Sequence, residues 1–139
     1  MSNAKTLFLE CKVMGRLVNS VIDTGATISA ISAKFTDGCD IRREKALPIQ
    51  VGDGQLLFSR GVTEIEVALG SELVKHECMV VDTEAFEAVL GMDFLHGNQM
   101  INGLLFHPPR LVVNNKEIRL REEAMRWLRP TTSWPILPT

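Results

Sequence analysis

Apolar runs of strand length alternate with turn residues along most of this sequence, and this pattern limits the chain to a mainly β fold. The predicted strands are 7–13, 17–22, 27–32, 47–51, 55–58, 64–69, 78–81, 111–113 and 116–120. Strands that recur about every 8–12 residues are typical of an all-β barrel or sandwich. The Asp53-Gly54 pair between two apolar runs is a strong hairpin signal, because a type I′ turn requires positive φ at both central residues. Two short helices are also predicted, at 92–96 and at 122–128.

Composition places the chain among ordinary globular proteins and excludes several kinds of partner. Its 139 residues are the length of one domain. The 15 basic and 17 acidic residues give a net charge of −2, so we expect no nucleic-acid partner and no anionic-membrane partner. No apolar run reaches the roughly 18–20 residues that cross a bilayer. The first residues lack the apolar core of a signal peptide, so we expect an intracellular, reducing compartment, either cytoplasmic or particle-associated.

Three widely spaced cysteines, Cys11, Cys39 and Cys78, are expected to be free thiols in such a compartment. The only close pair of potential metal ligands in the sequence is His76 and Cys78, and the CxxC spacing of zinc sites does not occur. We therefore predict buried or half-buried thiols, with neither a metal nor a cofactor.

The segment Asp23-Thr24-Gly25 directly follows an apolar run that ends at Ile22. The Asp23 carboxylate would lie where a buried strand ends, beside the Thr24 hydroxyl. Gly25 could bring a backbone N–H close to another group because it has no Cβ. Such a site can hold a carboxylate with N–H and O–H donors. The triplet alone, however, more often marks a strand that ends in an Asx turn.

The sequence around the triplet resembles that of the retropepsin-like aspartic proteases of retroviruses and retrotransposons. Within 9–32, a strand, a Gly turn and an apolar strand lead into Asp-Thr-Gly-Ala, as at the start of that family. The hairpin around Gly52 is similar to the flap that closes over substrate. The segment 88–95 (AVLGMDFL) is similar to the second family signature, most of all in retrotransposon members. Three motifs in the right order are far more specific than one.

This resemblance implies both the fold class and the assembly. It implies an all-β, closed, mostly antiparallel acid-protease barrel with one or two short helices, which acts as a C2 homodimer. The similarity extends to about residue 121, so we predict a protease domain at 1–121 and a C-terminal short helix and Pro-rich tail at 122–139. The apolar segment 134–138 is expected to pack against its own or the partner's barrel, or else to be a substrate-like segment near a processing site.

The same resemblance implies a homodimeric aspartic endopeptidase that hydrolyses extended, polyprotein-type polypeptides. One carboxylate must be ionised to take a proton from water while a second, protonated one polarises the substrate carbonyl, and two such close carboxylates share a proton. The sequence has one Asp-Thr-Gly, so Asp23 of each chain would supply one carboxylate, supported by Thr24 and Gly25. The residues expected to contact substrate are Ala26, Thr27, Ile28, Val51, Gly52, Asp53, Gly54, Gln55 and Val89.

The sequence departs from the family pattern at a few positions. Thr27 and Ile28 stand where many retroviral members have acidic residues that hold the substrate backbone, and Met92 stands where an Arg is common. Asp53 is interpreted as a solvated turn residue; the alternative is a flap-tip carboxylate that meets its copy and favours acidic pH. The alternative functions are a catalytically inactive dimerisation and peptide-binding module, which the costly buried carboxylate pair argues against, and a metal-binding β domain.

Overall fold

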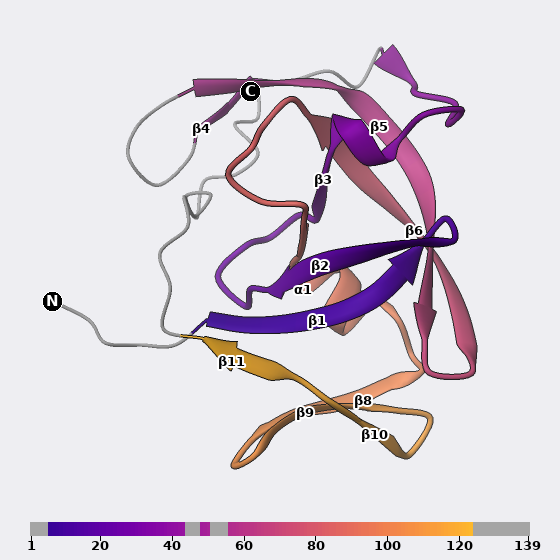
Figure 1. Ribbon diagram of the computed structural model, residues 1–139, viewed down its shortest axis with the longest axis vertical. Helices are drawn as coiled ribbons and strands as arrows, with labels where there is room; N and C mark the ends of the chain where they lie inside the picture. Colours follow the sequence, from indigo (N-terminus) through magenta and orange to yellow (C-terminus); the bar gives the residue numbers. More distant parts are fainter. Residues whose placement is uncertain (1–5, 44–47, 51–55, 124–139) are drawn as a thin grey trace, which may run out of the picture.

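The structure, a computed structural model, describes residues 6–43, 48–50 and 56–123, and these form a mostly β fold with one short α-helix (Figure 1). The strands of the first half are β1 (Thr6–Val13), β2 (Arg16–Ile22), β3 (Ala30–Ser32), β4 (Pro48–Gln50) and β5 (Leu56–Leu69). The later elements are β6 (Glu72–Val81), β7 (Ala88–Leu90), α1 (Met92–Gly97), β8 (Ile101–Phe106), β9 (Pro109–Val113), β10 (Lys116–Arg119) and β11 (Arg121–Glu123). A 3-10 turn, Ala33–Phe35, follows β3.

Eight strands form the larger sheet, in the order β11-β1-β2-β7-β3-β6-β5-β4. Because β5 also pairs with β1, these two strands and the four between them in this order form a closed ring of pairings. Most pairs are antiparallel, but β2 with β7 and β3 with β6 are parallel. A second sheet, in the order β10-β9-β8, lies below the larger one in Figure 1. Strand β11 then returns the chain to β1.

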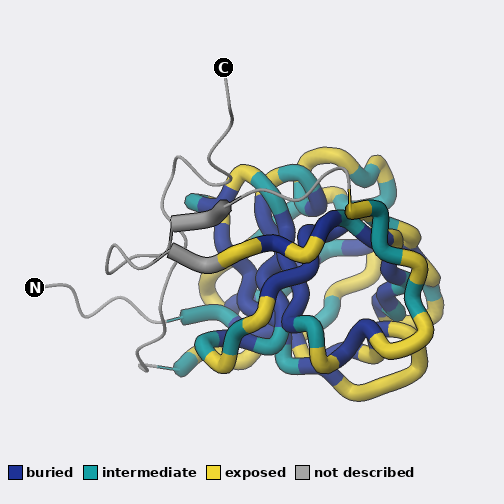
Figure 2. Tube along the Cα trace, turned by 90° about the horizontal axis from the view of Figure 1, so that it is seen from above, coloured by how far each residue is buried: buried dark blue, intermediate teal, exposed yellow. Residues whose placement is uncertain are grey.

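The core lies inside this ring, on the side to which alternate residues of each strand point (Figure 2). Val13, Val67 and Val74 face one another across β1, β5 and β6, and all three are buried. A smaller buried cluster comprises Phe8, Val21, Ala26, Ala30, Met79, Val81, Phe86 and Val89. It packs around the two parallel strand pairs, and it includes the residue that follows the Asp-Thr-Gly triplet.

The tight turns follow from residues that tolerate positive φ. The predicted turn between the first two strands places Met14 at φ 53° and Gly15 at φ 79°, which is the type I′ combination that suits hairpins. The predicted turn between β9 and β10 does the same with Asn114 and Asn115. Asparagine adopts this region more readily than most residues do. Both hairpin predictions are confirmed.

Other predictions of secondary structure need correction. The strand predicted at 27–32 is only Ala30–Ser32, because the residues before it form the loop that carries the triplet. The runs 56–58 and 64–69 belong to one long strand, β5, and Gln55 at the start of the predicted strand 55–58 lies outside the described residues. The helix predicted at 122–128 is wrong at its start, since Arg121–Glu123 is strand β11. There, backbone pairing with the open edge of β1 outweighs local helix propensity. The other predicted helix is confirmed as α1.

Candidate functional site

Asp23 lies directly after β2, at the point where this strand leaves its parallel partner β7. Its backbone N–H continues the ladder by donating to the Leu90 carbonyl at 3.0 Å. The residue is 7% exposed. Its Oδ1 accepts a hydrogen bond of 2.8 Å from the backbone N–H of Gly25, which is the use predicted for that glycine. The triplet thus holds a buried carboxylate with a main-chain donor, and Thr24 lies exposed beside it.

The loop after Asp23 is fixed against the start of α1. The Met92 backbone N–H donates to the Ala26 carbonyl at 2.8 Å. Gly91 packs so closely on the same carbonyl that an added Cβ would lie 2.6 Å from its oxygen, so a larger residue would displace one of the two backbones. The second signature therefore supports the first one through direct backbone contact.

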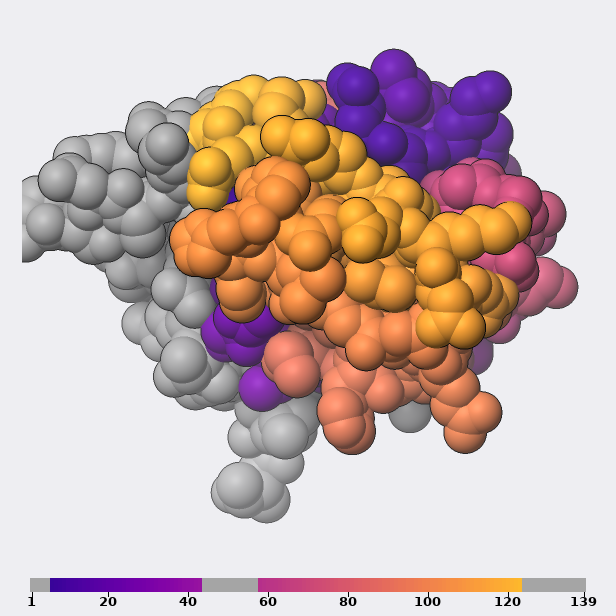
Figure 3. Space-filling view, turned by 90° about the horizontal axis from the view of Figure 1, so that it is seen from below, coloured from indigo at the N-terminus to yellow at the C-terminus, as the bar shows by residue number. Residues whose placement is uncertain are grey.

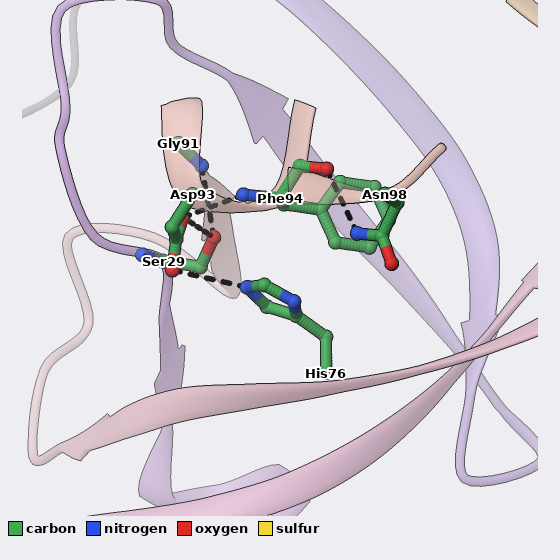
Figure 4. Close-up of polar contacts among 6 residues, drawn as sticks. All are labelled: Ser29, His76, Gly91, Asp93, Phe94 and Asn98. Carbon is green, nitrogen blue, oxygen red and sulfur yellow. Dashed lines mark hydrogen bonds and ion pairs between the residues drawn. The ribbon is translucent and has the colours of Figure 1, made fainter. Parts of the chain in front are cut away.

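A second aspartate, Asp93, connects this loop to the helix and to β6 (Figure 4). The Ser29 hydroxyl donates to its Oδ1 at 2.7 Å, and the Ser29 backbone N–H donates to its Oδ2 at 3.1 Å. The Phe94 backbone N–H also donates to Oδ1, at 2.8 Å. On the other side, Nε2 of His76 lies 3.0 Å from Oδ2. The Ser29 hydroxyl in turn accepts from the Gly91 N–H at 2.9 Å.

The surroundings of Asp93 stabilise its ionised form. Burial alone would raise the pKa of this carboxyl, but the hydrogen bonds from His76 and Ser29, with the charge of His76, hold the pKa below its ordinary value. An ionised carboxylate only accepts hydrogen bonds, so the His76 nitrogen donates to it. Sequence reasoning missed this role, because Asp93 does not repeat the Asp-Thr-Gly motif. Its place two residues after Gly91, in the first turn of a helix, was the available signal.

The predicted substrate-contact residues have different environments. Thr27 is exposed, and Ile28 is half-buried against the smaller core cluster. Ala26 and Val89 are fully buried in that cluster, so their assignment to substrate pockets stays a prediction. The predicted flap residues Val51, Gly52, Asp53, Gly54 and Gln55 lie outside the described residues.

A groove of about 290 Å³ lies directly beside the triplet. Thr24 lines one part of it, Met92 and Leu95 of α1 another, and Ile101 and Leu104 of β8 a third. Thus the surface next to Asp23 is hollowed and largely apolar. This groove was not predicted, because β8 was not recognised in the sequence.

Among the residues that the structure describes, no group of three or more His, Cys, Asp or Glu side chains is arranged to hold a metal ion. Within those ranges no helix is long and apolar enough to span a bilayer. Cys11, Cys39 and Cys78 are free thiols, and burial raises the pKa of Cys11 and Cys78. Thiols of this kind are poor nucleophiles.

Comparison with known proteins agrees with this arrangement. The model of a family described as gag-polyprotein putative aspartyl protease matches residues 9–97. The retroviral protease-like domain of Ddi1 from Leishmania major matches with a TM-score of 0.66 at 23% identity, over 84% of this chain and 94% of that one. EIAV protease complexed with the inhibitor HBY-793 gives a TM-score of 0.47 at 19% identity, over 69% of this chain and 88% of that one. The likeness to the Ddi1 domain confirms the predicted all-β, retropepsin-like fold class, whereas the C2 homodimer stays a prediction.

Proposed function

We propose that this chain, which belongs to the gag-polyprotein aspartyl protease family of retropepsin-like proteins, is an aspartic endopeptidase that works as a homodimer. The observation that carries the proposal is the buried Asp23 carboxylate, held by the Gly25 N–H on a loop that Gly91 and Asp93 fix in place. Burying a carboxylate is costly, and a site that only binds peptide has no use for it.

Hydrolysis in this proposal uses a water molecule held between Asp23 of two chains. The ionised carboxylate takes a proton from the water, whose oxygen attacks the peptide carbonyl carbon. The protonated carboxyl of the other chain donates its proton to the carbonyl oxygen, so a neutral tetrahedral diol forms. When the diol collapses, the carboxyl that took the water's proton donates it to the leaving nitrogen and the C–N bond breaks. The ionised carboxylate of the other chain takes the proton of one diol hydroxyl, whose oxygen becomes the carbonyl of the product, so one ionised and one protonated carboxyl are regenerated. The two titrations belong to the pair and not to either residue alone.

The surface beside Asp23 supports a second copy of the chain as the partner. The groove next to Thr24 continues onto β8, which has a neighbouring strand on one side only within the described residues. The sequence of β8 carries no charge, and its Leu105 and Phe106 are 40% and 54% exposed. Figure 3 shows β8 to β10, coloured orange, on the face seen from below. An uncharged edge strand readily pairs with another strand, so we place the twofold contact along β8 and the groove.

The proposed substrate is an extended polypeptide of the polyprotein type, added as a strand across the dimer. Thr27 can offer its hydroxyl to the substrate backbone, whereas Ile28 can offer only apolar surface, so we expect apolar subsites. The flap residues 51–55 would close over the substrate and exclude water. The free thiols agree with a reducing compartment as the place of action.

The test is cleavage of a diverse peptide mixture between about pH 4 and 7, with wild type and Asp23→Asn compared by mass spectrometry. Light scattering gives the oligomeric state of each sample. Cuts that only the wild type makes are the expected result, and their ends define the subsites. A wild-type dimer that makes no cut would overturn the proposal in favour of an inactive peptide-binding module.

A further inference from the structure

We propose that His76 is a positioning residue for Asp23, which it holds in place through Asp93 and Ser29. The inference rests on the proposed function, since it concerns the same carboxylate. It adds a residue on β6 that takes no part in the Asp-Thr-Gly motif and that no feature of the sequence pointed to.

The loop from Asp23 to Ser29 is fixed at its far end by the Ser29 side chain. Ser29 is fully buried, and its hydroxyl both donates to Asp93 and accepts from the Gly91 N–H. Its backbone N–H donates to the other oxygen of the same carboxylate. The position of this loop therefore follows the orientation of the Asp93 carboxylate, on which two of these three bonds depend.

His76 sets that orientation from the opposite side. Its Nε2 lies 3.0 Å from Oδ2 of Asp93, and its ring meets the ring of Phe94 edge to face, with centroids 5.1 Å apart. The His76 and Asp93 side chains are only 15% and 27% exposed. Strand β6 also touches the loop directly, because the Met79 N–H donates to the Ser29 carbonyl at 3.1 Å. His76 thus connects Ser29 to β6 through Asp93 (Figure 4), and the Met79 N–H connects Ser29 to the same strand directly.

A carboxylate that loses one hydrogen-bond donor has more freedom to rotate towards water. Without His76, Asp93 would still accept from Ser29 and Phe94, so the fold would persist, but the loop would sample more orientations. The distance between the two Asp23 carboxylates of the proposed dimer would then vary. Small misplacements of reacting groups lower the rate of the chemical step far more than they weaken binding. Substrate contacts predicted at Thr27, Ile28 and the flap are not part of this cluster.

The experiment compares kcat and KM for wild type, His76→Ala, His76→Gln and Lys75→Ala, on a peptide that the wild type cuts. All are assayed well below their melting temperatures and at concentrations where each is a dimer. Glutamine keeps an N–H donor close to the position of Nε2, and Lys75 is the exposed neighbour of His76 on the same strand. Amide hydrogen exchange is measured on the same four proteins.

We expect His76→Ala to lower kcat on the order of tenfold or more, with KM within about twofold of wild type, and His76→Gln to recover most of the loss. Exchange of the Ser29 and Gly91 amides should become faster in His76→Ala and stay unchanged in Lys75→Ala. An unchanged kcat with only a lower melting temperature would show a purely structural role and overturn the inference. If the wild type cuts nothing, the proposed function fails, while the exchange data still decide whether His76 holds the loop.

Discussion

Asp23 and Asp93 each follow one strand of the same parallel pair, Asp23 after β2 and Asp93 after β7, yet their surroundings differ. The Asp93 carboxylate accepts hydrogen bonds from Ser29, Phe94 and His76, all of its own chain. Asp23 accepts from Gly25 and lies beside an apolar groove with an exposed Thr24. The first arrangement stabilises the loop. The second suits a carboxylate whose proposed chemistry needs a partner from another chain. The donors around a carboxylate, more than its burial, distinguish the two roles.

The largest expected difference is in stability. Asp93→Ala should lower the free energy of unfolding by about 2–4 kcal/mol, because it leaves buried donors of Ser29 and the His76 side chain without an acceptor. Asp23→Ala removes the acceptor of the Gly25 N–H and should cost less, about 1 kcal/mol. Urea denaturation of both variants measures the two values. Equal losses would remove the distinction between the two carboxylates.

The contact between Gly91 and the loop that follows Asp23 should be disrupted by a single added methyl group. Gly91→Ala would place a Cβ 2.6 Å from the Ala26 carbonyl oxygen, so we expect a loss of about 1–3 kcal/mol together with a displaced Asp23 loop. Gly97→Ala, at the opposite end of α1, is the control: a Cβ there meets nothing within 4 Å, so stability should change by less than about 0.5 kcal/mol. Thermal unfolding of both variants measures the two changes in stability. An unchanged stability in Gly91→Ala would mean that the close contact between Gly91 and Ala26 does not hold the Asp23 loop in place.

A smaller effect should appear in acid. The pKa of Asp93 is held below its ordinary value, so its contribution to stability is complete above about pH 4 and is lost as the pH falls through the lowered pKa. Asp93→Asn should therefore show a weaker fall in stability at acidic pH than the wild type. Melting temperatures recorded from neutral to acidic pH test this. Parallel curves for the two proteins would show that another group is responsible.

The smallest effect is expected at an exposed ion pair. Lys34 and Glu84 lie 3.4 Å apart, with side chains 49% and 88% exposed. Glu84→Ala should change the free energy of unfolding by less than about 0.5 kcal/mol, because water and salt screen such pairs. Together with Asp93→Ala, measured in the same urea series, it separates the effect of burial from that of charge. A loss of stability similar to that of Asp93→Ala would argue that the buried contacts of Asp93 contribute no more than a surface ion pair.

The sequence predicted the position of Asp23 but not the role of Asp93. The Asp-Thr-Gly triplet is local, so the position of Asp23 at a strand end and its bond from Gly25 could be foreseen. The role of Asp93 depends on Ser29 and His76, which are 64 and 17 residues away along the chain. Only the pairing of β3 with β6 and β7 brings them together. Likewise β11 forms because β1 has an open edge, which no local propensity reveals.

In the proposed dimer one active site needs Asp23 from two chains, and an experiment with mixed subunits tests this requirement. Wild type and Asp23→Asn are combined in varying ratios at constant total concentration, left to exchange subunits, and assayed on one peptide. If each site uses one carboxylate from each chain, only wild-type dimers cut, so activity should fall as the square of the wild-type fraction. Activity that falls in simple proportion to that fraction would mean that a single chain carries a complete site and that the proposed shared site is wrong.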